Sequence, residues 1–183
     1  MAEFHKVYIQ EIKQETADAV SVVFSIPEDL KADFNFTAGQ YVTLQKEING
    51  ETIRRAYSIC ATPASGEIRV AIKKVEKGVF STYATSDLKV GDAIEITTPE
   101  GRFLLNPEVH KNYIGFAAGS GITPILSMLK SVLIKEPTAT FTLIYGNKSA
   151  ADTIFYKELN QLKETYIDRL KLHYIFSREN VKN

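Results

Sequence analysis

The chain has 183 residues, of which 44% are hydrophobic and 24% are charged, so we expect it to fold around a core rather than to remain disordered. Lys plus Arg and Asp plus Glu number 22 each, and this balance gives no electrostatic reason to expect a nucleic acid or an anionic membrane as partner. A single cysteine excludes an internal disulfide, a four-cysteine zinc site and a ferredoxin-type cluster within the chain.

The N-terminus, Met-Ala-Glu-Phe-His-Lys, has no apolar signal core. No uninterrupted apolar run reaches the roughly 18 residues that a membrane-spanning helix needs. These features predict a soluble, cytoplasmic protein. The three histidines are dispersed and show no metal-ligand spacing, so we assign no metal.

Short strands are expected through the first hundred residues. Residues 20–26 are rich in β-branched side chains and end at Pro27, and Asn49-Gly50 is typical of a tight turn. The strands are expected over residues 7–13, 20–26, 40–45, 56–60, 68–75 and 93–97. This spacing predicts a small antiparallel barrel or sandwich over residues 1–106, interrupted by one short helix near residues 78–86.

After Asn106-Pro107 the pattern changes to alternating strands and helices. Strands are expected over 113–118, 140–145 and 170–176, and helices over 124–135 and 152–166. The alternation predicts a parallel sheet with crossover helices over residues 107–183. Doubly wound sheets usually carry five or six strands, so we expect this domain to be incomplete at its C-terminus and the chain to be a fragment.

A glycine-rich turn joins the first of these strands to its helix. It reads Gly119, Ser120, Gly121, Ile122, Thr123, Pro124. Glycine permits positive φ, Thr123 fits an N-cap and Pro124 fits the first helical position. The turn is therefore a candidate anion site, because unpaired amides and the helix dipole point to one spot. The alternative is a turn that only lets the helix pack closely on its sheet.

Two polar segments are further candidates. Alternation along Arg55-Ala56-Tyr57-Ser58 puts Arg55 and Tyr57 on one face, where a guanidinium holds a phosphate and a phenol stacks on a planar ring. The alternative is a surface cross-strand pair. Ser177 and Arg178 follow the last strand, at the edge where nucleotides bind in parallel sheets. The alternative for that pair is a solvated chain end.

Three motifs in series resemble the ferredoxin-NADP reductase superfamily. They are Arg55-Ala56-Tyr57-Ser58 as R-x-Y-[ST], Gly78-Val79-Phe80-Ser81 as G-x-x-[ST], and Gly119 to Pro124 as G-x-G-x-x-P. Within that superfamily the chain looks most like reductase components of multicomponent oxygenases of the phenylacetyl-CoA epoxidase type. Those reductases continue into a complete nucleotide domain and a plant-type [2Fe-2S] domain, and neither continuation is present in this chain.

The resemblance implies an FAD site in the barrel. Arg55 would bind the pyrophosphate, Tyr57 would stack on the isoalloxazine and the Ser58 hydroxyl would hydrogen-bond N5. The backbone of one strand would contact the flavin and one turn would cap the pyrophosphate; these residues are Val70, Ala71, Ile72, Lys73, and Gly78, Val79, Phe80, Ser81, Thr82.

The resemblance also implies a nicotinamide-dinucleotide site in the second domain. The turn from Gly119 to Pro124 would hold the dinucleotide, with Thr123 near the nicotinamide. The segment Tyr145, Gly146, Asn147 would flank the same ligand. Ser177 and Arg178 resemble the pair that binds an adenosine 2′-phosphate, which favours NADPH over NADH.

Together these features predict a flavoprotein oxidoreductase. Electrons would pass from NADPH through FAD to an iron-sulfur protein or domain, in an oxygenase or ferredoxin system, with Tyr57, Ser58 and Thr123 at the reacting atoms. The alternative function is a flavin- or nucleotide-binding electron-relay or regulatory subunit that has no turnover of its own.

Overall fold

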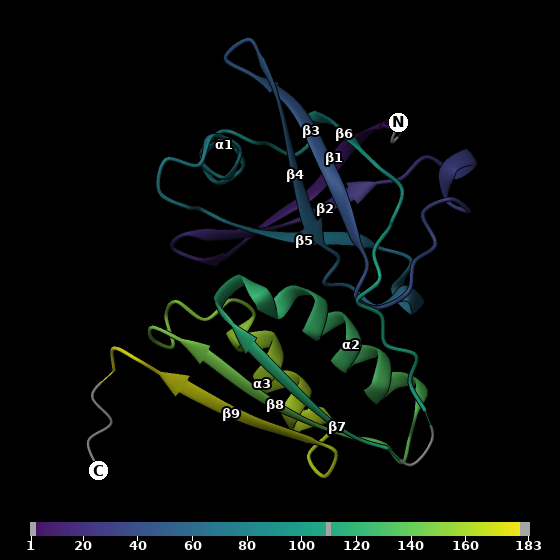
Figure 1. Ribbon diagram of the computed structural model, residues 1–183, viewed down its shortest axis with the longest axis vertical. Helices are drawn as coiled ribbons and strands as arrows, with labels where there is room; N and C mark the ends of the chain where they lie inside the picture. Colours follow the sequence, from purple (N-terminus) through teal and green to yellow (C-terminus); the bar gives the residue numbers. More distant parts are fainter. Residues whose placement is uncertain (1–2, 109–110, 180–183) are drawn as a thin grey trace.

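The computed structural model describes residues 3–108 and 111–179, which form two units stacked one above the other (Figure 1). The first unit is a six-stranded antiparallel sheet in the order β4-β3-β6-β1-β2-β5. Its strands are β1 His5–Thr16, β2 Ala19–Ser25, β3 Tyr41–Ile48, β4 Glu51–Ser58, β5 Ile68–Lys73 and β6 Ala93–Ile96. A bridge between Ile59 and Val70 joins the end of β4 to β5 and curls the sheet into a barrel.

The barrel encloses its own hydrophobic core. Val7, Val22, Val42, Leu44 and Ile96 are fully buried there. Helix α1, Val79–Ser86, closes one side of the barrel with Phe80 and Ala84 buried against the core. Alternation of buried and exposed residues along β1 and β3 is what an antiparallel sheet with one solvated face requires.

The second unit is a parallel sheet in the order β7-β8-β9. Its strands are β7 Asn112–Ala118, β8 Thr140–Asn147 and β9 Leu170–Phe176, connected by α2 Ile122–Lys135 and α3 Tyr156–Thr165. Phe141 and Leu143 of β8 pack with Leu126 and Leu129 of α2 and with Leu159 of α3 in one core. This architecture confirms the predicted barrel followed by a small parallel sheet.

The largest differences from the predicted bounds are at the starts of α3 and β4. Helix α3 begins at Tyr156 rather than near residue 152, because Phe155 has a left-handed φ of +62° that a helix cannot include. Strand β4 begins at Glu51 rather than near residue 56. Residues 51–55 are mostly polar and exposed, so hydrophobic patterning missed them, and they are strand because they pair with β3 beyond the barrel.

Helix α2 lies between the barrel and the second sheet (Figure 1). Its buried side chains share a core with small residues of the barrel, namely Ala19, Ala38, Cys60 and Ala71. Gly39 also belongs to this contact, because a Cβ there would lie 2.4 Å from Met128 Cε of α2, and its φ of +103° also favours glycine. Small residues on the barrel therefore allow the helix to approach closely.

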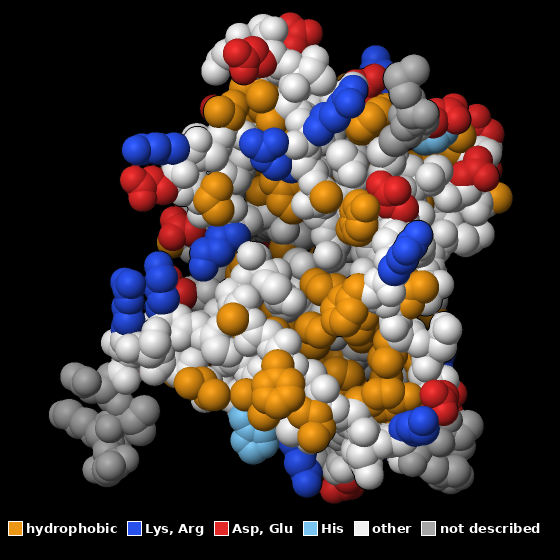
Figure 2. Space-filling model, viewed as in Figure 1, with side chains coloured by type: hydrophobic (Ala, Val, Ile, Leu, Met, Phe, Trp, Pro, Cys, Tyr) orange, Lys and Arg blue, Asp and Glu red, His pale blue; other side chains and the backbone are white. Residues whose placement is uncertain are grey.

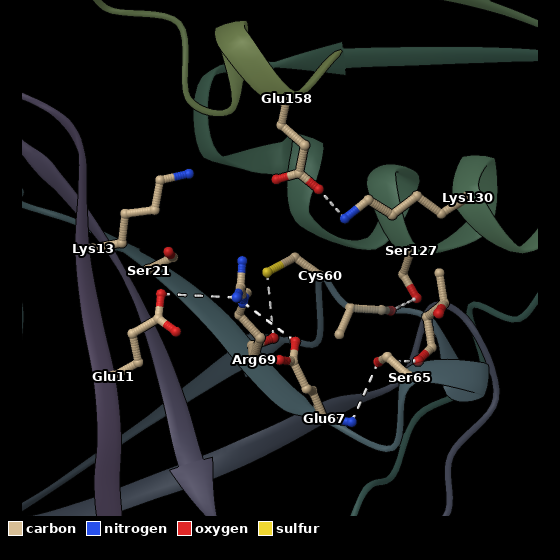
Figure 3. Close-up of polar contacts among 12 residues, drawn as sticks. Glu11, Lys13, Ser21, Cys60, Ser65, Glu67, Arg69, Ser127, Lys130 and Glu158 are labelled. Atoms are coloured by element: carbon tan, nitrogen blue, oxygen red, sulfur yellow. Dashed lines mark hydrogen bonds and ion pairs between the residues drawn. The ribbon is translucent and has the colours of Figure 1, made fainter. Parts of the chain in front are cut away.

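Polar contacts cross the same seam, which we define as the contact between α2 and the barrel (Figure 3). The Ser127 hydroxyl of α2 donates a hydrogen bond to the Ala61 carbonyl oxygen at 2.6 Å, and both residues are buried. Next to it the Cys60 thiol donates to the Arg69 carbonyl at 3.3 Å. Lys130 of α2 pairs with Glu158 of α3 at the border of the seam. Burial raises the pKa of the Cys60 thiol to about 12, so this cysteine is a core residue.

The face of the parallel sheet opposite α2 and α3 is open and apolar. Ile114, Phe116 and Ile175 are more than half exposed on it. Figure 2 shows hydrophobic side chains gathered over this lower half of the molecule. No helix within residues 3–108 and 111–179 combines the length and apolar character needed to cross a membrane.

The seam hydrogen bond predicts that replacing two serines one turn apart on α2 has different effects on stability. Ser127→Ala removes a buried partner of the Ala61 carbonyl and should lower the free energy of unfolding by about 1–2 kcal/mol. Ser131→Ala is the matched control, since the Ser131 hydroxyl is equally buried but donates to the Ser127 carbonyl of its own helix at 2.8 Å. Urea unfolding measures both changes, and an equal loss in the two variants would contradict the role of the seam.

Candidate functional site

A cavity of about 470 Å³ lies where the barrel meets the start of α2. Four segments line it: β4, β5 with the residues just after it, the beginning of α1, and the turn into α2. The lining residues are Arg55, Ala56, Tyr57, Ser58, Ala71, Lys73, Val75, Gly78, Phe80, Ser81, Ser120, Gly121, Thr123 and Pro124. Residues more than sixty positions apart in the sequence therefore face the same space.

The β4 wall contains all four residues of the Arg55–Ser58 segment. Alternation alone puts Arg55 and Tyr57 on the face opposite Ala56 and Ser58. All four reach the cavity because β4 is the last strand of the sheet order and meets β5 only at the bridge between Ile59 and Val70. The cavity lies at that open strand edge, so both sides of the strand border it.

Tyr57 lies at the barrel surface and is half-buried. Its ring centroid is 5.8 Å from that of Phe80, with the two planes tilted by 36°. Burial raises the pKa of the Tyr57 phenol to about 12, and the nearby Arg55 charge lowers it in part. The phenol is therefore neutral at physiological pH, and its ring packs beside that of Phe80.

The α1 wall presents free backbone amides. Helix α1 has Gly78 as its N-cap, and no side chain caps its first turn. The Ser81 hydroxyl instead holds the preceding turn, because it accepts from the Val75 amide at 3.2 Å and donates to the Gly78 carbonyl at 3.3 Å. A Cβ at Gly78 would lie 2.4 Å from both Ser81 Oγ and Val75 Cγ2, so a larger residue there would displace these side chains.

The α2 wall is formed by the predicted glycine-rich turn. Gly119 has a left-handed φ of +50° and residues 119–121 form a 3-10 turn. The prediction that Thr123 is the N-cap is wrong, because Gly121 occupies that position and Thr123 is already helical. The Thr123 hydroxyl donates back to the Ser120 carbonyl at 3.1 Å. No side chain caps the first turn of α2, although the Ile122 amide donates to carbonyls of the 3-10 turn and Pro124 has no N–H.

The charged side chains that line the cavity are all positive. Arg55 and Lys73 contribute two cations, and no carboxylate is among the lining residues. Across the described ranges, no acidic side chain lies within ion-pair distance of Arg55. Two uncapped helix starts add to the positive potential. The arrangement suits an elongated anion that carries a planar ring.

Several predicted residues lie outside this cavity. Val70, Ile72 and Ile122 are buried in the cores, so only their backbones are available to a ligand. Val79 and Thr82 face a second cavity on the other side of α1. Sequence reasoning missed Val75, which lines the first cavity and is exposed. The only sequence feature that could have indicated its role is its position just after β5, on the same side as Lys73.

Tyr145 holds the glycine turn in place from the core side, away from the cavity. Its side chain is completely buried, so it does not reach the cavity. Its hydroxyl donates to the Gly119 carbonyl at 2.8 Å and also lies 3.4 Å from the Ile154 carbonyl. Burial raises the pKa of this phenol, which stays a donor. Tyr145 therefore joins the left-handed first residue of the glycine turn to β8.

The carboxyl ends of β8 and β9 bring the remaining candidates together. The Ser177 amide donates to the Asn147 carbonyl at 3.0 Å, and the Arg178 amide donates to the Lys148 carbonyl at 2.9 Å. Both side chains of the Ser177–Arg178 pair are exposed. The buried Asn147 amide nitrogen has no hydrogen-bond partner in the described part of the chain. Gly146 pairs with Ile175 at the same sheet edge, just before this pair in β9.

Comparison with known proteins identifies both units. The family described as oxidoreductase FAD-binding domain matches residues 6–104, and the oxidoreductase NAD-binding domain family matches residues 116–183. The chain is 40% identical, over 183 residues, to one of the subunits of the 1,2-phenylacetyl-CoA epoxidase of Escherichia coli. That match covers 99% of this chain and 51% of the relative.

A further sequence relative and a solved structure show the same kinship. The ferredoxin reductase component of the 3-ketosteroid-9-alpha-monooxygenase of Rhodococcus rhodochrous is 33% identical, over 88% of this chain and 46% of that protein. The ferredoxin-NADP+ reductase of Plasmodium falciparum superposes with a TM-score of 0.82 at 22% identity, over 96% of this chain and 74% of that one, which shows a shared fold. The chain spans about half the length of the curated relatives it matches.

The contact between Tyr145 and Gly119 predicts a stability effect. Tyr145→Phe keeps the buried ring but removes the side-chain donor to the Gly119 carbonyl, which keeps only the Ile122 amide, so the free energy of unfolding should fall by about 1 kcal/mol. Tyr8→Phe is the control, because Tyr8 is half exposed on β1. Urea unfolding compares the variants. If Tyr145→Phe were as stable as Tyr8→Phe, the hydroxyl would not be holding the turn.

Proposed function

Because the chain belongs to the oxidoreductase FAD-binding domain family and has the ferredoxin-NADP reductase fold, we propose that it passes electrons from NADPH through FAD to an iron-sulfur protein. It would act as the reductase component of an oxygenase or ferredoxin system. The main support is the cavity in which β4, α1 and the glycine turn of α2 face one another. A flavin held by the barrel and a nicotinamide held by α2 would meet there.

The residues of the cavity fit a flavin dinucleotide. Arg55 has no carboxylate partner in the described chain and is free to bind a pyrophosphate with its guanidinium. The amides of the first α1 turn are uncapped, and Gly78 leaves the space that a Cβ would fill. Tyr57 offers a fixed, neutral ring for stacking. Each chemical part of FAD except the adenosine thus has a matching group.

The roles of the residues at the reacting atoms follow from this placement. Bound FAD would accept a hydride from the nicotinamide and release electrons one at a time. Tyr57 would orient the ring system, and the Ser58 hydroxyl would hydrogen-bond N5. Thr123, at the start of α2, would help to position the nicotinamide. The protein supplies orientation and fixed charge, and no side chain has to form a covalent bond.

The nucleotide would extend along the carboxyl ends of β7, β8 and β9. The glycine turn would hold it near the flavin, Gly146 and Asn147 would lie beside it, and the Ser177–Arg178 pair would bind a 2′-phosphate. Support comes from the unpartnered Asn147 amide and the exposed Arg178 at that edge. This is our reason for preferring NADPH to NADH.

We also propose where the two units divide, which protein accepts the electrons and where in the cell the protein acts. The FAD-binding unit would comprise residues 1–106 and the nucleotide-binding unit residues 107–183, with the boundary in the loop after β6. The electron acceptor would be a ferredoxin or a [2Fe-2S] domain, and the location would be the cytoplasm. Two relatives carry names that describe an epoxidase subunit and a ferredoxin reductase component, which supports an oxygenase context.

The proposal predicts a yellow protein that NADPH bleaches. Purified chain loaded with FAD should lose its visible flavin absorbance when it is mixed with NADPH in the absence of oxygen. Arg55→Ala should weaken FAD binding by about tenfold to a hundredfold, because a charge-assisted bond to the pyrophosphate is lost. Arg54→Ala is the matched control, since Arg54 bonds to Gln45 and is not among the residues lining the cavity.

The outcomes separate the two candidate functions. Failure to bind FAD would overturn both. A chain that binds FAD but is not bleached by NADPH would favour the electron-relay or regulatory subunit. Equal FAD affinity in the Arg54 and Arg55 variants would remove the proposed role of Arg55 while leaving the flavin site in place.

The nucleotide preference gives a separate prediction. Arg178→Ala should raise the NADPH concentration needed for half-maximal bleaching rate by about tenfold and leave that for NADH unchanged, because only NADPH carries the 2′-phosphate. Lys171→Ala, a charge loss elsewhere on β9, is the control. Stopped-flow absorbance measures both nucleotides, and an equal effect on NADH would contradict recognition of the phosphate.

A further inference from the structure

The loop that follows β8 is held in one shape by its own hydrogen bonds. The Ser149 hydroxyl donates to the Asp152 carboxylate at 2.6 Å, and the Asp152 amide donates to the Ser149 hydroxyl oxygen at 3.3 Å. Thr153 is buried, its hydroxyl donates to the Ser149 carbonyl at 2.8 Å, and its amide donates to the Ala150 carbonyl at 3.1 Å. The next two residues of the chain belong to the core. The backbone amide of Ala150 therefore has a fixed position.

The segment that follows β9 is bonded to the end of β8 and to this loop. Figure 1 shows the chain after β9 beside the end of β8. In two backbone bonds, the Ser177 and Arg178 amides donate to carbonyls at the end of β8 and just after it. A third bond uses a side chain, because the Ala150 amide donates to the Glu179 carboxylate at 2.6 Å. Arg178 is therefore held on both sides, by the backbone bonds before it and by the Glu179 side chain after it.

The Glu179 carboxylate binds a backbone amide rather than a neighbouring cation. Among residues 3–108 and 111–179, none of the ion pairs includes Glu179, Arg178 or Lys148. Exposed ion pairs gain little in water, whereas a carboxylate that accepts from a fixed amide forms a charge-assisted hydrogen bond. The Arg178 guanidinium is exposed and stays available to a ligand although an acidic residue follows it directly in the chain.

We propose that Glu179 is a positioning residue for recognition of the 2′-phosphate of NADPH, an inference that rests on the proposed function. The Glu179 carboxylate fixes the backbone on the C-terminal side of Arg178 to the Ala150 amide, and the Arg178 guanidinium then reaches the phosphate. Ordering a free segment when a ligand binds lowers affinity, and a segment that is ordered in advance avoids that loss. Glu179 acts through Arg178 and does not itself touch the phosphate.

The test compares 2′-phospho-AMP with AMP, because the two probes differ only in the 2′-phosphate. Isothermal titration calorimetry measures their binding to the full chain, and no flavin reaction is needed. The unaltered chain should bind 2′-phospho-AMP about tenfold more tightly than AMP. Glu179→Ala should weaken binding of 2′-phospho-AMP by about fivefold and leave that of AMP unchanged, because Arg178 must then be ordered by the ligand. Equal affinity of the unaltered chain for both probes would overturn the phosphate site and this inference with it.

Glu179→Gln separates the hydrogen bond from the charge. It keeps an oxygen that accepts from the Ala150 amide, so its affinity for 2′-phospho-AMP should lie within about twofold of the unaltered chain. If Glu179 contributed charge alone, Glu179→Ala and Glu179→Gln would both bind the phosphate more tightly than the unaltered chain, and that result would overturn the proposal. An equal loss in both variants would also overturn it. Glu164→Ala removes an exposed acid from α3 and, as the matched control, should change neither probe.

Flavin bleaching gives a second readout. In the FAD-loaded chain, Glu179→Ala should raise the NADPH concentration for half-maximal bleaching rate by about fivefold, with the maximal rate and both values for NADH unchanged. A fall in the maximal rate with both nucleotides would indicate a general defect and overturn the positioning role. If neither nucleotide bleaches the unaltered chain, the proposed electron transfer fails, while the comparison of 2′-phospho-AMP with AMP still decides the role of Glu179.

Discussion

The packing of α2 on the barrel is the contact on which the site depends. Small barrel residues, among them Cys60 and Ala71, share one core with the buried face of α2, and the Ser127 hydroxyl closes the contact on the Ala61 carbonyl. The start of the same helix carries Thr123 and the glycine turn. Helix α2 is thus a rigid link, and its position sets the distance between the two walls of the cavity.

Contacts within the protein position the groups that line the cavity. The uncapped first turns of α1 and α2 are held by internal hydrogen bonds, from Ser81 in one case and from Tyr145 through Gly119 in the other. Tyr57 is fixed by contact with Phe80. Fixed dipoles need little reorganisation when charge moves between cofactors, which is the contribution a protein can make when the cofactors carry the chemistry.

Some local features can be predicted from the sequence and others cannot. The glycine turn lies where its motif predicts it, but Gly121 rather than Thr123 is the N-cap, because the 3-10 turn over residues 119–121 shifts the helix start. The start of α3 depends on the left-handed Phe155, a conformation that residue type does not signal. The family resemblance places Tyr145 beside a ligand, whereas its hydroxyl supports the turn from the core. The first two differences arise from local backbone conformation and the third from a tertiary contact, and residue type alone signals none of them.

The sequence by itself determined the order of the two units, the antiparallel and parallel character of their sheets and the three motifs that carry the family resemblance. These properties follow from periodicity and from glycine positions, which are local. Only the tertiary structure decided that Arg55, Gly78 and Gly121 border one cavity, and that a second cavity lies across α1. Such convergence depends on barrel closure and on the packing of α2, which are contacts between residues far apart in the chain and leave no local pattern.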